Sequence, residues 1–228
     1  MLPQIRRYHY ITVLAAQIFL LFIAAVMEHH IALTILFIIA LFGIFGSVIS
    51  TIWGSSLWRF LAILSALIAL ISGLMGFIPG FSDQAIRFGL VICCFSYASF
   101  ILISIISIGK HVFVADRVTA NRIIGSICLY MLLGMFFAFL FAAMGLLSPQ
   151  SFDMSHAGET TSMVTLRDFI YFSYSTLTTT GYGDMIPAHP ISRMVVCVEE
   201  VAGSIYLAIM VARLVGMHVT QSRMHAKD

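Results

Sequence analysis

The chain has 228 residues, of which 61% are hydrophobic and only 10% are charged. Soluble domains carry about 25% charged residues, so this composition excludes a soluble protein and indicates an all-α integral membrane protein. The net charge of +2 comes without a dense basic run, which argues against nucleic acid as a partner.

Six apolar segments predict membrane-spanning helices, because a bilayer core of about 30 Å needs roughly 20 residues of helix. The first segment could instead be a signal peptide, since Arg6 and Arg7 precede it, although its apolar run is long for one. In chain order the segments are Ile11–Met27, Ile31–Ile52, Phe60–Ile78, Phe88–Ile108, Ile123–Leu147 and Met194–Val215.

The basic residues predict the orientation, because Lys and Arg concentrate on the cytoplasmic side of membrane proteins. If both termini are cytoplasmic, most basic residues lie inside. The inside group is Arg6, Arg7, Arg59, Lys110, Arg117, Arg122, Arg213, Arg223 and Lys227, and the outside group is Arg87, Arg167 and Arg193. We therefore expect a multi-pass protein of the plasma or inner membrane, with the segment Ser148–Thr165 on the outer side.

Residues 1–109 are expected to form a four-helix transmembrane region. Small residues at close spacing predict tight helix packing there, with a lipid or ligand pocket as the alternative. Residues 110–122 alternate polar and apolar side chains, which predicts an interfacial linker helix on the inner membrane surface. This linker could act as a lever on the following span or serve only as a connector, and both alternatives stay open.

The remaining region, residues 123–228, begins with an outer helix predicted at 123–147. A shorter helix is predicted at 166–178, because Thr165 and Asp168 have the Ser/Thr-x-x-acid spacing of a helix start. At about 20 Å it is too short to cross, and two glycines then turn the chain back. Non-helical backbone at that depth is tolerated only where it is buried in protein or lines a water-filled path.

The turn after this helix, Thr176-Leu177-Thr178-Thr179-Thr180-Gly181-Tyr182-Gly183-Asp184, resembles the selectivity filter of potassium channels. The resemblance implies a filter at 179–183 that binds potassium ions as the one metal, with no other cofactor. Its ligands would be the carbonyls of Thr179, Thr180, Gly181 and Tyr182 and the Thr179 hydroxyl. Alternate glycines, Gly181 and Gly183, remove the steric cost of pointing successive carbonyls at one axis.

A ring of carbonyls needs four such loops, and the chain supplies one. The expected assembly is therefore a homotetramer with three further identical subunits, or a heterotetramer with close relatives, surrounded by membrane lipid.

The resemblance also covers the surroundings of the filter. Tyr171 and Phe172 occupy the positions of an aromatic cuff around it. Ser175 stands where some members of the family have an acid that supports Asp184, and Thr180 stands where valine is commonest. These departures put the inactivation behaviour in doubt, whereas selectivity is expected to survive.

The last span resembles the inner helix of small prokaryotic channels and is predicted at 191–217. Gly203 falls at the hinge glycine of that family, and a small residue that allows close helix contact is the alternative. The residues expected to line the cavity and inner gate share one helical face: Gly203, Ser204, Leu207, Val211 and Val215.

Two adjacent acids in this span, Glu199 and Glu200, are costly in a membrane and require a reason. Glu199 is expected to hydrogen-bond behind the filter with Ser175, Thr178 or their neighbours. Successive helical residues point about 100° apart, so Glu200 cannot do the same job. It could face the cavity and attract cations, and its role stays open.

Six spans with the pore in the last two resemble prokaryotic six-transmembrane potassium channels of voltage-gated architecture. A voltage sensor needs an arginine at every third position of the fourth span, and this one has only Arg87 at its outer edge. One charge crossing the field is worth about 2.3 kcal/mol per 100 mV, so four subunits would supply at most roughly 9 kcal/mol. Weak or absent voltage dependence is therefore predicted, and the gating stimulus stays open. Candidate proton sensors on the outer side are His29, His30, His156 and His189.

The predicted function is therefore passive, potassium-selective conduction. A non-conducting or modulatory subunit is the main alternative. A carrier is disfavoured, because potassium transporters built from filter-like loops carry four per chain. The sequence contains no Ser/His/Asp constellation, phosphate loop or metal-ligand spacing, so we expect no enzymatic activity.

Overall fold

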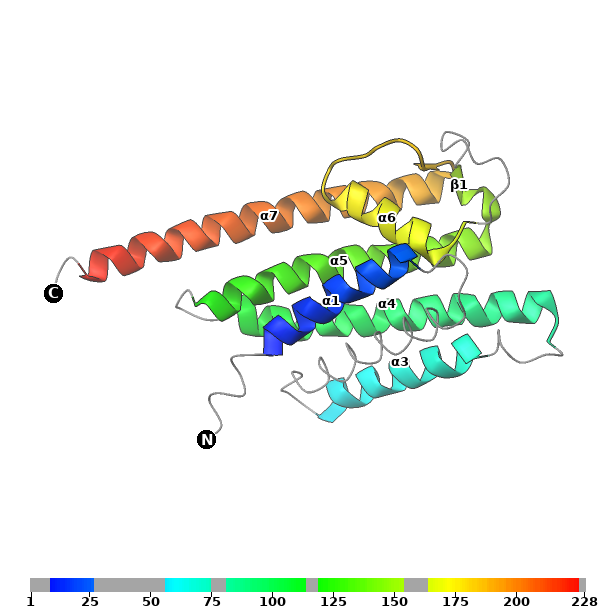
Figure 1. Ribbon diagram of the computed structural model, residues 1–228, viewed down its shortest axis with the longest axis horizontal. Coiled ribbons are helices and arrows are strands. Elements are labelled where there is room, and N and C mark those ends of the chain that lie inside the picture. The colour runs from blue at the N-terminus through cyan, green and yellow to red at the C-terminus, as the bar shows by residue number, and fades with distance from the viewer. Residues whose placement is uncertain (1–8, 27–55, 75–80, 114–118, 154–163, 226–228) are drawn as a thin grey trace. The chain divides into compact units, whose positions relative to one another are not determined.

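The computed structural model describes residues 9–26, 56–74, 81–113, 119–153 and 164–225 (Figure 1). These residues are mainly helical. The helices are α1 (His9–Val26), α3 (Ser56–Leu74), α4 (Asp83–Phe113), α5 (Ala120–Leu147), α6 (Leu166–Leu177) and α7 (Pro190–His225). A 3-10 turn, η3 (Pro149–Ser151), and two short strands, β1 (Phe152–Asp153) and β2 (Ile186–Pro187), complete the described part.

Four of the helices are long and apolar enough to cross a membrane. The membrane-capable segments are Leu57–Leu74, Asp83–Lys110, Asn121–Leu147 and Pro190–Arg213. They correspond to the third to sixth predicted spans. The first predicted span coincides with α1, which holds a shorter apolar segment, Tyr10–Ala24. The second predicted span, Ile31–Ile52, lies outside the described residues.

The predicted linker helix at 110–122 differs from the structure at its start. Residues Lys110–Phe113 continue α4 as one 31-residue helix, and α5 already begins at Ala120. Residues 114–118 lie outside the described part. The apolar side chains of Val112 and Phe113 extend the apolar character of α4, which is why the helix runs past the first polar residue of the linker.

The chain divides into two compact units. The first consists of Met1–Trp53, Ile105–Met131 and Ser204–Asp228. Two contacts in it connect the carboxyl half of α7 to other helices. The Tyr206 hydroxyl donates to the carbonyl of Ser126 on α5 at 2.6 Å. The Arg213 guanidinium donates to the carbonyl of Val112 at 2.9 Å and lies over the ring of Phe113, so it caps the last turn of α4.

The second unit consists of Gly54–Ser104 and Leu132–Gly203. Its core is an aromatic cluster formed by Phe141 on α5, Phe152 on β1, and Phe169 and Phe172 on α6. The ring centroids of Phe172 lie 5.3 Å from Phe141 and 5.5 Å from Phe152, and Phe152 lies 5.2 Å from Phe169. Edge-to-face aromatic contacts of this kind add to the free energy of burial and restrict orientation. The cluster therefore fixes α6 on α5.

Two glycines of α5 allow α6 to approach it closely. A Cβ atom at Gly134 would lie 2.8 Å from the ring of Tyr174, and one at Gly145 would lie 2.5 Å from the ring of Phe169. Gly145, the later glycine on α5, meets the earlier residue of α6, so the two helices run antiparallel.

The short strands join the end of α5 to the start of α7. β1 and β2 pair antiparallel, with Phe152 opposite Pro187. The carbonyl of Ser151 accepts hydrogen bonds from the amides of Ala188 at 2.9 Å and His189 at 3.4 Å, and the Ser192 hydroxyl lies 2.8 Å from the same oxygen. The chain that leaves α6 is thereby returned to a fixed point beside the carboxyl-terminal end of α5.

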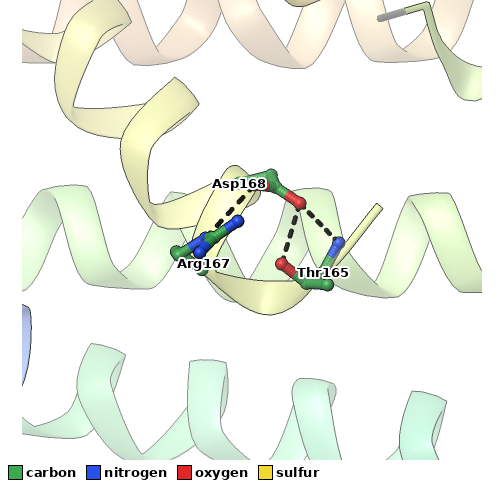
Figure 2. Close-up of polar contacts among 3 residues, drawn as sticks. All are labelled: Thr165, Arg167 and Asp168. Carbon is green, nitrogen blue, oxygen red and sulfur yellow. Dashed lines mark hydrogen bonds and ion pairs between the residues drawn. The ribbon is translucent and has the colours of Figure 1, made fainter. Parts of the chain in front are cut away.

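The amino terminus of α6 is capped as the sequence predicts. The Asp168 carboxylate accepts hydrogen bonds from the backbone amide of Thr165 at 2.7 Å and from its hydroxyl at 2.8 Å (Figure 2). An acid at the third helical position satisfies a free donor and complements the positive pole of the helix. Arg167 Nε lies 3.6 Å from Asp168 Oδ1, a long and partly exposed ion pair that contributes little.

Replacing Asp168 by alanine removes both hydrogen bonds to Thr165. We expect Asp168→Ala to lower the free energy of unfolding by about 1–2 kcal/mol. Asp168→Asn, which keeps an acceptor oxygen, should lose less. Thermal unfolding in detergent, followed by circular dichroism, measures both variants. Equal stability of Asp168→Ala and the wild type would contradict the capping role.

Candidate functional site

The candidate site begins where α6 ends. The helix has 12 residues, a length of about 18 Å, which is well short of the roughly 30 Å of a bilayer core. After the cap residue Thr178 the chain turns back to β2 and the start of α7 (Figure 1). The predicted helix at 166–178 and the observed Leu166–Leu177 thus agree closely.

The backbone of the turn alternates in conformation. Among the described residues, positive φ angles occur at Thr179 (59°), Gly181 (52°) and Gly183 (78°). The residues between them, Thr180 and Tyr182, have negative φ. When every second residue has a left-handed conformation, successive carbonyl groups can point to the same side of the backbone. Glycine adopts this conformation without steric cost. The two glycines were expected to have this conformation. Thr179 was not.

The amide groups of the turn bond to the end of α6. Thr180 and Gly181 donate to the carbonyl of Ser175 at 2.8 and 3.1 Å, and Thr179 donates to that of Thr176 at 2.8 Å. Within the described part of the chain, the carbonyls of residues 179–183 accept no hydrogen bond. The turn therefore presents a row of exposed carbonyl oxygens, and the amides of its first three residues, Thr179, Thr180 and Gly181, are bonded to the end of α6.

Threonine hydroxyls support the start of the turn. The Thr178 hydroxyl donates to the carbonyl of Tyr174 at 2.7 Å. Because the single proton of the Thr178 hydroxyl is engaged in this bond, the Thr180 hydroxyl, 3.0 Å away, donates to Thr178 Oγ1. Thr180, at a position where valine is commonest in the family that the sequence resembles, therefore has a hydrogen bond that a valine could not make.

Tyr171 supports the carboxyl-terminal end of the turn through two contacts. Its hydroxyl donates to Asp184 Oδ2 at 2.8 Å, and its ring stacks on that of Tyr182 with centroids 5.9 Å apart and an interplanar angle of 10°. The other oxygen, Asp184 Oδ1, accepts from the amide of Met185 at 3.0 Å. Asp184 thus has a side-chain partner, although Ser175 replaces the acid expected to provide one.

Phe172 and Ser175 lie away from the turn's side chains. Phe172 belongs to the aromatic cluster on α5, and the Ser175 hydroxyl donates to the carbonyl of Phe172 at 2.9 Å. Successive helical residues point about 100° apart, so Tyr171 and Phe172 cannot both face Tyr182. Ser175 supports the turn through its backbone carbonyl, and the side-chain type at this position does not predict that role.

Glu199 on α7 lies behind α6 and is fully buried. Its Oε1 atom lies 2.5 Å from the hydroxyl of Ser173 on α6. The expected partners, Ser175 and Thr178, use their hydroxyls within α6 instead. Ser173 was not predicted, because nothing in its sequence neighbourhood distinguishes it from the other hydroxyl residues of this helix.

The predicted lining residues of α7 separate into two groups. Ser204, Leu207, Val211 and Val215 are exposed and share one face, and Glu200 lies four residues before Ser204 on the same face. Gly203 is buried instead. A Cβ atom at Gly203 would lie 2.8 Å from Leu177 Cδ1 and 2.9 Å from the Leu177 carbonyl oxygen, so this glycine allows α7 to pass the end of α6. The close contact supports the packing alternative for Gly203.

The part of the chain that carries this site is similar to a known protein family. Residues 126–219 match the protein-family model described as an ion channel. The match begins in α5 and ends in α7, so it includes α6 and the turn, but it covers less than half of the chain. No curated protein and no solved structure matches the sequence.

An alanine at Gly203 tests whether this residue is a packing contact or a hinge. We expect Gly203→Ala to lower the free energy of unfolding by about 1–3 kcal/mol, because the Leu177 carbonyl cannot move without displacing the turn. Gly216→Ala is the matched control in the same helix, since a Cβ there meets nothing within 4 Å, and alanine favours the helix by up to about 1 kcal/mol. If both variants unfold at the same temperature in detergent, the packing role is wrong.

Proposed function

We propose that the chain is one subunit of a potassium-selective channel that conducts passively across the membrane. The observation that carries the proposal is the row of carbonyl oxygens at residues 179–183, with alternating φ angles and with the amides of residues 179–181 bonded to α6. Carbonyls fixed in this way can replace the hydration shell of a potassium ion. The proposed ligands are the carbonyls of Thr179, Thr180, Gly181 and Tyr182 and the Thr179 hydroxyl.

The end of α6 adds a favourable field. A helix carries about half a negative charge at its carboxyl terminus, which for α6 lies at the start of the turn. This partial charge favours a cation at the inner end of the filter. In an assembly of several subunits, the partial charges of the α6 helices around one axis would add.

The proposed assembly is a tetramer of identical subunits. One turn supplies one quarter of a ring of ligands, so a single chain cannot enclose an ion. The surface of α7 supports assembly as well, because only 17% of its membrane-capable segment is buried within the chain. The exposed face with Ser204, Leu207, Val211 and Val215 would line the cavity and inner gate, with other faces against lipid or neighbouring subunits. Glu200 lies four residues before Ser204 on the same face, so it would face the cavity side.

Flux through liposomes tests the proposal. The purified wild-type protein should carry potassium down its gradient and exclude sodium. Gly181→Ala should abolish the flux, because a side chain at φ 52° costs about 1–2 kcal/mol and displaces the neighbouring carbonyls. Gly109→Ala is the control, since a Cβ there makes only an ordinary contact of 3.9 Å with Phe113.

Two outcomes of this assay would contradict the proposal. Wild-type protein without potassium flux points to a non-conducting or modulatory subunit. Equal sodium and potassium flux refutes selectivity.

The proposed channel is weakly voltage-dependent or independent of voltage. Within α4 the ionisable side chains other than thiols and Tyr97 are those of Asp83, Arg87 and Lys110, near its ends, and that of His111. Voltage steps in planar bilayers should change the open probability less than a sensor with several arginines would, since each charge is worth about 2.3 kcal/mol per 100 mV. A steep rise of conductance with voltage would contradict this assignment.

A further inference from the structure

The hydroxyl of Ser173 faces two acceptors. Ser173 is fully buried on α6, and its Oγ atom lies 2.7 Å from the carbonyl oxygen of Gly134 on α5 and 2.5 Å from Glu199 Oε1 on α7. A serine hydroxyl carries one proton. It therefore cannot donate to both oxygens, and one of the two contacts needs a proton from elsewhere.

The surroundings of Glu199 do not suit a charge. The side chain is fully buried, its second oxygen, Oε2, has no hydrogen-bond partner, and no cation among the described residues pairs with it. An ionised carboxylate buried with a single hydrogen bond costs several kcal/mol, whereas the neutral acid costs much less.

We propose that Glu199 is a proton-binding site and that its carboxylic acid form is the resident state of the folded chain. The acid proton on Oε1 is donated to Ser173 Oγ, and the Ser173 proton is donated to the carbonyl of Gly134. Two protons then serve two contacts, and every donor in the relay has an acceptor. The relay Glu199–Ser173–Gly134 joins α7, α6 and α5.

The neighbouring titratable groups are consistent with a proton at this position. Tyr174 on α6 and Glu200 on α7 are the groups that interact electrostatically with Glu199. Tyr174 is neutral at physiological pH, and the charge of exposed Glu200 opposes a second negative charge beside it. The facing part of α5, residues 132–147, contains no titratable side chain.

The relay meets α6 at Ser173, two residues before Ser175, whose carbonyl accepts the amide hydrogen bonds of the turn. Ser173 is anchored by Glu199, and Ser175 accepts the amide hydrogen bonds of Thr180 and Gly181. The proton on Glu199 is thus part of the support of α6 behind the turn. Its consequence for conduction rests on the proposed function, whereas its presence on Glu199 does not.

Infrared difference spectroscopy of the full-length chain in detergent at neutral pH tests the site. The spectrum of the wild type minus that of Glu199→Gln should contain the carbonyl stretch of a protonated carboxylic acid, which the variant loses. Glu200→Gln is the matched control, and it should lose the bands of an ionised carboxylate instead. If Glu199→Gln removes ionised carboxylate bands, the proposal is overturned.

A second measurement covers the case in which Glu199→Gln does not fold. Wild-type protein labelled with ¹³C at the glutamate carboxyls has four such groups, at Glu28, Glu159, Glu199 and Glu200. Solid-state NMR should detect one protonated carboxyl at neutral pH, and four ionised carboxyls would overturn the proposal. Neither readout needs ion flux, so a non-conducting protein with this signal would refute the channel and leave the proton site standing.

Discussion

The hydrogen bonds from the amides of Thr180 and Gly181 to the carbonyl of Ser175 are the interactions on which the candidate site depends. They join an irregular, exposed segment to the last turn of a helix. A segment with free carbonyls has no ladder or helix of its own to hold it, so its geometry must come from the element behind it. The position of α6 therefore determines the position of every proposed ligand.

Three kinds of interaction fix α6 in the second unit. Asp168 caps its first turn, the aromatic rings of Phe169 and Phe172 pack on α5 and β1, and Ser173 connects it to Glu199. The contacts of Phe169, Phe172 and Ser173 reach three other elements, α5, β1 and α7, so rotation and translation of α6 are both restricted. Tyr171 connects α6 to the carboxyl-terminal end of the turn through its contacts with Asp184 and Tyr182.

The sequence predicted the elements that depend on local chemistry. The cap at Thr165, the length of α6 and the left-handed glycines follow from residue types at short spacing, and the structure has all three. It did not predict the bond from Tyr171 to Asp184 or the partner of Glu199, because both depend on which helix faces meet. The burial of Gly203 and of Phe172 is set by the same packing. Whether residues 31–52 form a further span stays a prediction.

Selectivity is the central claim, and the reversal potential of purified wild-type protein in a planar bilayer tests it most directly. With potassium on one side and sodium at equal concentration on the other, a filter made of the carbonyls of residues 179–183 predicts a current that reverses far from zero, in the direction of the potassium equilibrium potential. A current that reverses at zero voltage under these conditions would contradict the account.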